Sequence, residues 1–121
     1  MGFIYSFEKL EVWKESKTLS KLVYKFTVEF PDFEKFGLVT QMRRASTSVC
    51  SNLAEGSSRI SAKDQAHFYQ IAYGSLMELL NQIIISGELG FIEDYIVSQS
   101  RDQIEKISRM INALRNQRLN M

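Results

Sequence analysis

The chain has 121 residues, enough for one domain with a single hydrophobic core and too few for two such cores. Hydrophobic residues make up 45% and charged residues 24%, a composition that predicts a soluble globular protein and excludes a disordered one. The net charge of +1 gives the whole molecule no general attraction to nucleic acid or to an anionic membrane. One cysteine and one histidine exclude an internal disulfide and a Cys/His zinc cluster, and they favour a reducing, cytoplasmic setting.

No segment indicates membrane insertion or export. Residues 1–8 lack the basic region and long apolar core of a signal peptide. The longest purely apolar runs, such as residues 83–85, fall far short of the ~20 residues that span a bilayer. We therefore expect no membrane partner.

The first half of the chain predicts two helices. Apolar residues recur at helical spacing over residues 10–30, and Pro31 ends this segment. The same spacing returns over residues 38–56. Gly56 stands where a helix commonly ends in a left-handed glycine cap.

The second half predicts two more helices. Ser61, followed three residues later by Asp64, has the pattern of a helix start, and Gly90 ends the helix over residues 61–89. The fourth helix begins near Ile92, with acids in its first turn and arginines in its last, as the helix dipole favours. Short connections between long helices predict an all-α, antiparallel, up-down-up-down four-helix bundle without strands.

The third predicted helix carries two apolar stripes instead of one. A single bundle covers one stripe well and would leave the other exposed, so we expect a second subunit to cover it in a cyclic homo-oligomer. The interface candidates are Tyr69, Tyr73, Met77, Leu80 and Ile84.

Motifs for catalysis, metal binding and cofactor binding are lacking. His67 is not preceded by the Glu-x-x of a di-iron bundle, and it is interpreted as a helix-surface or partly buried residue. Cys50 has no histidine near it in the sequence and is interpreted as a packed, inert thiol. Phosphate-binding, dinucleotide-binding and nucleophile-elbow motifs are also lacking. We therefore expect a non-enzyme with no catalytic residue, no metal and no cofactor.

The second predicted helix is rich in small polar residues that favour helices weakly. If it pairs with the third helix about a turn near residues 59–61, Arg44 comes within one helical turn of Glu78. A buried or half-buried ion pair is predicted there. The expected polar network is Arg44, Asn52, Glu55, Ser75 and Glu78. A register-fixing role in the bundle is favoured over the alternative of a ligand site.

Basic residues gather in two modest patches, which are explained either by solvated helix faces or by contacts with phosphates. Arg44 belongs to the first patch as well. The remaining candidates for contact with nucleic acid are Arg43, Arg59, Lys63, Arg101, Lys106, Arg109, Arg115 and Arg118. Repetition of these patches around an oligomer would let a near-neutral chain bind RNA or DNA, which is the alternative to a scaffold or adaptor role.

The chain also carries a series of short motifs. They are Phe7-Glu8-x-Leu10-x-Val12-Trp13, Phe30-Pro31 followed by Gly37-Leu38, Gln41-x-Arg43-Arg44-Ala45, Ser48, Ser51-Asn52-x-Ala54-Glu55-Gly56, Phe68, Ala72 and Gly74-Ser75-x-x-Glu78-Leu79. Over residues 7–118, taken as one domain, the chain resembles the bacterial four-helix-bundle family named for the 23S rRNA intervening-sequence proteins. The resemblance implies a barrel-like homopentamer with a central channel. One branch of that family is the accessory protein of diversity-generating retroelements, which binds a reverse transcriptase and nucleic acid.

Two features differ from that family. Cys50 stands where family members often have proline before the Ser-Asn-x-Ala-Glu-Gly stretch. The retroelement branch is strongly basic, whereas this chain is near neutral. The resemblance therefore implies a homo-oligomeric fold more directly than it implies binding to RNA or to a nucleic-acid-processing protein.

Overall fold

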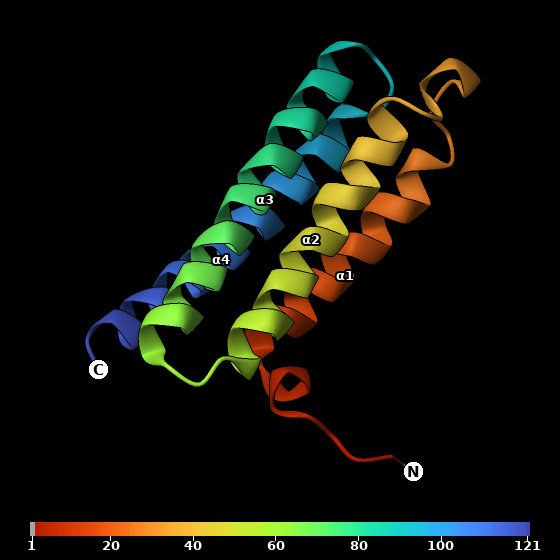
Figure 1. Cartoon of the computed structure of the whole chain (residues 1–121). Helices are drawn as coiled ribbons and strands as arrows, with labels where there is room; N and C mark the ends of the chain where they lie inside the picture. The colour runs from red at the N-terminus through yellow and green to blue at the C-terminus, as the bar shows by residue number, and fades with distance from the viewer. Residues whose placement is uncertain (1) are drawn as a thin grey trace.

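The computed structural model describes residues 2–121, and the regular structure in that range is entirely helical. Its elements are η1 (Ser6–Lys9), α1 (Glu11–Thr27), η2 (Asp32–Glu34), α2 (Leu38–Ser58), α3 (Ala62–Glu88) and α4 (Asp94–Leu119). Successive long helices run antiparallel, and α1 packs beside α4 to close the bundle (Figure 1). The predicted all-α four-helix fold is confirmed.

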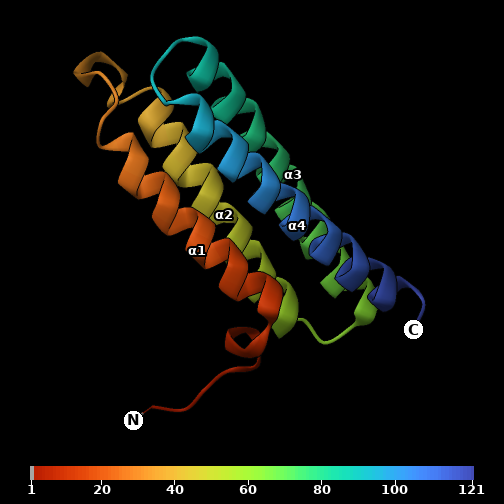
Figure 2. The same cartoon turned by 180° about the vertical axis from the view of Figure 1, so that it is seen from behind.

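The two ends of the bundle differ in what they contain. Both chain termini and the α2–α3 connection lie at one end, called here the terminal end (Figure 2). The α1–α2 and α3–α4 connections lie at the other, called the loop end. None of the helices in the described range has the length and apolarity needed to cross a bilayer.

A single apolar core runs through the bundle, and all four long helices contribute to it. Its fully or almost fully buried members are Leu19, Val23, Met42, Val49, Leu53, Tyr69, Ala72, Leu76, Leu79, Ile83, Ile104, Ile107 and Ile111. Full burial of a side chain of this size stabilises the folded state by about 1.5–3 kcal/mol. The spacing of these residues at three and four is the helical periodicity that the sequence shows.

Small hydroxyl side chains join α2 to both of its neighbours. Ser20 of α1 and Ser46 of α2 share a buried hydrogen bond of 3.0 Å between their Oγ atoms. Ser48 of α2 and Ser75 of α3 share another of 2.9 Å. Because these side chains are short, the backbones approach closely, and α2 and α3 pack together more extensively than any other pair of helices.

Gly56 does not form the predicted left-handed cap. It lies inside α2 and is buried, and within residues 2–121 only Gly90, just after α3, has a positive φ, of 79°. A Cβ atom at Gly56 would lie 2.7 Å from Cε1 of Tyr69 and 3.0 Å from Cβ of Phe68. This glycine is therefore needed for close packing of α2 against α3.

Two helix boundaries differ from the prediction. α1 ends at Thr27 instead of Phe30, because the residues before a proline disfavour helical geometry, and the N–H of Phe30 donates to the Thr27 carbonyl at 3.1 Å. α4 begins at Asp94 instead of near Ile92, which is buried against the core ahead of the helix. Ser61 caps α3 as predicted: its hydroxyl accepts a 3.1 Å hydrogen bond from a backbone N–H three residues on.

Candidate functional surfaces

The α2–α3 seam, defined as the outward-facing line where these helices meet, contains part of the predicted polar network. Asn52 donates from Nδ2 to the carbonyl of Ser48 at 2.9 Å and to its Oγ at 3.1 Å. The Ser48 hydroxyl in turn bonds to Ser75. Two predicted members, Asn52 and Ser75, are thus brought together through Ser48, which was not among the predicted network residues.

The other three predicted members do not join this network. Arg44 and Glu78 are both exposed, and no ion pair connects them, so the predicted buried pair is wrong for the single chain. Glu78 accepts a 3.3 Å hydrogen bond from Nε2 of Gln82 one turn further along α3. Glu55 is exposed and pairs with Arg59 at 2.7 Å. The small residues of α2 bring the backbones close, but the two long charged side chains extend outward from that contact.

The α1–α2 groove is a shallow surface cavity of about 480 Å³. Its lining residues are Trp13, Lys17, Ser20, Lys21, Tyr24, Thr47, Cys50 and Ser51. Nζ of Lys17 lies 4.6 Å from the centre of the Trp13 ring, and the guanidinium of Arg43 lies 4.7 Å from that of Tyr24. Both distances are in the range of cation–π contacts. Two aromatic rings and two lysines thus line the groove, and Arg43 adds a third cation beside it, at the Tyr24 ring.

Sequence reasoning missed Lys17 and Lys21, because basic and acidic residues balance over the first part of the chain. Folding separates them: Glu15 faces α4, where it pairs with Lys106 at 2.8 Å. No acidic side chain lines the α1–α2 groove. The spacing of Trp13, Lys17, Lys21 and Tyr24, at intervals of four, four and three, is the signal that places them on one helix face.

Cys50 lies in the α1–α2 groove and is half-buried. Burial raises the pKa of its thiol to about 11, although a backbone hydrogen bond and the charge of Lys17 act in the opposite direction. The thiol is therefore protonated at neutral pH, as expected of a packed and unreactive cysteine.

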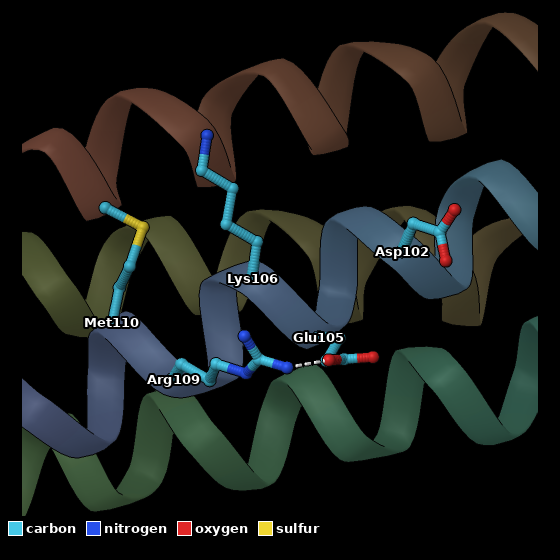
Figure 3. A pocket seen from close by; sticks show the side chains of 5 residues that line it. All are labelled: Asp102, Glu105, Lys106, Arg109 and Met110. Atoms are coloured by element: carbon cyan, nitrogen blue, oxygen red, sulfur yellow. Dashed lines mark hydrogen bonds and ion pairs between the residues drawn. The ribbon is translucent and has the colours of Figure 1, made fainter.

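The basic side chains predicted along α4 are largely engaged with neighbouring groups. Arg109 pairs with Glu105 along α4, and Lys106 extends toward α1 (Figure 3). There Lys106 pairs with Glu15 of α1. Arg115 donates to the side-chain oxygen of Gln70 on α3. This surface has mixed charge, and Arg101 is exposed on the same helix.

The first predicted basic patch is divided between two surfaces. Arg43 is half-buried and donates from Nε to Oγ1 of Thr27 at 3.0 Å, which holds it at the α1–α2 groove. Arg59 lies at the terminal end with its guanidinium 4.5 Å from the ring centre of Phe68. Lys63 is exposed near it in sequence, and Arg118 is half-buried at the end of α4.

The predicted interface stripe on α3 needs correction. Tyr69 is fully buried in the core, so it is not available for contact with another subunit. Tyr73, Met77, Leu80 and Ile84 are half-buried, and the first three pack against the core. The α3 isoleucines that do remain exposed are Ile71 and Ile85, at 40% and 42%.

The loop end exposes large apolar side chains among acids. Phe33 and Phe36 are 78% and 88% exposed, and Tyr95 is 65% exposed. Acidic residues outnumber basic ones at this end, where Glu29, Asp32, Glu34, Glu88, Glu93 and Asp94 lie with Lys25 and Lys35. The near-neutral total charge therefore conceals an acidic loop end and a more basic remainder.

The fold and these surfaces define a small, all-α protein built as one antiparallel four-helix bundle, with polar and basic side chains arranged along its interhelical grooves. Among residues 2–121, no group of three or more His, Cys, Asp or Glu side chains could hold a metal ion. The chain belongs to the 23S rRNA-intervening sequence protein family, whose model matches residues 8–113. The resemblance identified from the sequence motifs is confirmed.

A solved structure has the same fold. It is the crystal structure of a protein with unknown function from the S23 ribosomal protein family of Bacteroides thetaiotaomicron VPI-5482. The two chains are 19% identical, with a TM-score of 0.76 over 85% of this chain and 96% of the other. No curated protein matches this chain.

Proposed function

We propose that this protein is a non-catalytic, homo-oligomeric scaffold or adaptor, with five copies as the family resemblance implies. The observation that carries the proposal is the set of large apolar side chains left exposed on a single chain. They lie at the loop end, on α3 and in the N-terminal arm (residues 2–5), which leads away from the bundle in Figure 1; examples are Phe36, Ile71 and Phe3. Neighbouring copies in an assembly would cover these exposed side chains, and burying them would stabilise the association.

Light scattering at micromolar concentration tests the oligomer. The expected result is a mass several times the 14.0 kDa of one chain, or about 70 kDa for five copies. The exposed apolar side chains supply the driving force, so the assembly should persist at high salt, where surface ion pairs are screened. A mass of one chain at every concentration rejects the proposal.

A second candidate function is binding of single-stranded nucleic acid in the α1–α2 groove. Trp13 and Tyr24 offer ring faces on which bases can stack, and Lys17, Lys21 and Arg43 lie beside them to contact phosphates. Proteins that bind single strands without sequence preference combine these two elements. Lys17 and Arg43 now contact the rings of Trp13 and Tyr24. When a base stacks on either ring in place of the cation, that cation would turn toward the phosphate.

The single tryptophan of the chain provides the assay. A single-stranded RNA oligonucleotide stacked on Trp13 should quench its fluorescence, and K17E/K21E should abolish the quenching. Three phosphate contacts predict that the logarithm of the binding constant falls by about 2 for each tenfold rise in salt. Lys106→Gln on α4 is the matched control and should bind like the parent. Binding lost in the control but kept in K17E/K21E would assign nucleic acid to α4 instead.

A further inference from the structure

The loop-end cleft is a surface cavity of about 500 Å³ between the last turns of α1 and the start of α4. Its apolar walls include Phe26 of α1, Phe91 of the α3–α4 connection, and Tyr95 and Ile96 of α4. This volume is in the range of cavities that bind organic ligands. The cleft shares no lining residue with the α1–α2 groove, so it is a separate candidate site.

The turn that ends α3 fixes Phe91 at the cleft. Gly90 has a φ of 79°, and the N–H of Phe91 donates to the carbonyl of Ser86 at 2.9 Å, as in a glycine-terminated helix. The centre of the Phe91 ring lies 5.6 Å from that of Phe30 and 6.0 Å from that of Phe33. Both distances are in the range of favourable aromatic contacts. This wall of the cleft is therefore formed by the fold itself and needs no ligand to order it.

Carboxylates without cationic partners lie around the cleft. Glu29 and Glu93 line it, and both are exposed. Lys25 is the one cation among the lining residues, and within residues 2–121 it forms no ion pair with either acid. The same holds for the whole loop end, where six acids lie with two lysines and take part in none of the ion pairs of the described residues. A ligand complementary to this surface carries positive charge.

Exposed apolar side chains continue beyond the cleft, so the surface is larger than a small molecule requires. Val28, Phe33 and Leu89 belong to the same end of the bundle and are 69%, 78% and 55% exposed. A segment of a protein chain can cover such an area and insert one large apolar side chain into the cleft as an anchor. Exposed aromatic rings also attract arginine and lysine side chains. The surface therefore fits a segment that is both apolar and basic.

We propose that the loop-end cleft binds a basic segment of a partner protein, in which a large apolar side chain is flanked by arginine or lysine residues. The apolar side chain enters between Phe26, Phe91 and Tyr95, and the flanking cations meet Glu29 and Glu93. This inference deepens the adaptor role proposed above, because it names the class of partner. The acids of the loop end repel nucleic acid, an anionic membrane and the loop end of another copy, so the cleft is not complementary to any of these.

Fluorescence anisotropy with a dye-labelled synthetic peptide tests the cleft. The probe is a peptide of about 14 residues with leucines along one helical face and arginines elsewhere. Two matched peptides replace the arginines by glutamate or the leucines by serine. The parent protein should bind the probe, more weakly as salt rises, and should bind each matched peptide at least about tenfold more weakly than the probe.

Variants of the protein locate the binding. E29K/E93K should weaken binding of the probe at least about tenfold, and E29Q/E93Q, which only removes the charges, at least about threefold. E11K/E55K is the matched control, because it changes the net charge equally at exposed residues of α1 and α2 near the terminal end, and it should bind within about threefold of the parent. All four acids are exposed, so each variant should melt cooperatively like the parent.

The outcomes separate the cleft from the oligomer. A parent that does not bind the probe, a serine peptide that binds as well as the probe, or equal losses in E29K/E93K and E11K/E55K would each overturn the proposal and leave the oligomer unaffected. If E29K/E93K loses the parent's mass in light scattering, the cleft is occupied by another copy, and the proposal is overturned as well. A parent that binds the probe through these acids but has the mass of one chain keeps the cleft and rejects the oligomer.

Discussion

Replacing Gly56 by alanine tests whether this residue permits the close contact of α2 with α3. The added Cβ would lie 2.7 Å from Cε1 of Tyr69 and 3.0 Å from Cβ of Phe68. The Tyr69 ring is fully buried and packed within the hydrophobic core. The clash can therefore be relieved only by separating the helices or by forcing the ring from its preferred rotamer.

Two effects of opposite sign determine the size of the change. Overpacking a filled interior costs about 1–3 kcal/mol. Alanine favours a helix interior over glycine by up to about 1 kcal/mol, and less here because Gly56 lies in the last turn of α2. The expected net loss is about 1–2 kcal/mol out of a total stability of about 5–15 kcal/mol. For a domain of this size, that loss lowers the melting temperature by about 3–10 °C.

Urea and thermal unfolding followed by circular dichroism measure the effect, with Gly74→Ala as the matched control. Gly74 lies in the middle of α3 and has no atom within 4 Å of the position of a Cβ, so alanine there should raise stability by up to about 1 kcal/mol. Light scattering confirms that both variants have the parent's mass. If Gly56→Ala were as stable as the parent while Gly74→Ala behaved as expected, the packing argument would be refuted.

Three further predictions follow from individual side chains. Because burial raises the pKa of Cys50 to about 11, the native thiol should react with a disulfide reagent at pH 8 about 100-fold more slowly than the thiol of the unfolded chain. Each added pH unit should raise the rate of the native reaction about tenfold. Equal native and unfolded rates would contradict this prediction. Ser48→Ala should cost about 0.5–1.5 kcal/mol in urea unfolding, and combining it with Ser75→Ala should cost less than the sum, whereas strict additivity would show that the hydroxyls are not coupled. Tyr69→Phe should leave stability unchanged or slightly raised, because the buried hydroxyl has no partner among the described residues; a loss above about 1 kcal/mol would reveal a bond to that hydroxyl.

The helices and their order could be predicted from the sequence because the signals are local. Apolar spacing at three and four positions, the Ser61 cap and the break at Gly90 each act within a few residues of the chain. The structure has the four helices in the predicted order, with boundary differences at α1 and α4. Short connections leave antiparallel packing as the natural arrangement of such helices.

The tertiary structure decided which faces of these helices meet. Periodicity shows that α3 has two apolar stripes but not how α3 rotates about its axis, so Tyr69 was assigned outward and is instead in the core. The local sequence around Gly56 is compatible with a glycine that ends a helix and with a glycine that permits close packing of two helices. Only the contact with Tyr69 in the folded structure distinguishes these two roles.

The surfaces depend on tertiary packing in the same way. The spacing of Lys17 and Lys21 can be read in α1, but a basic groove exists only because α2 brings Arg43 beside Tyr24 while Glu15 faces α4. The sequence placed Arg44 and Glu78 within a helical turn of each other, but whether long charged side chains turn inward or outward depends on the space between the packed helices. Side-chain spacing along one helix is a local property, whereas contact between helices depends on the rotation and separation of all four, which no single segment encodes.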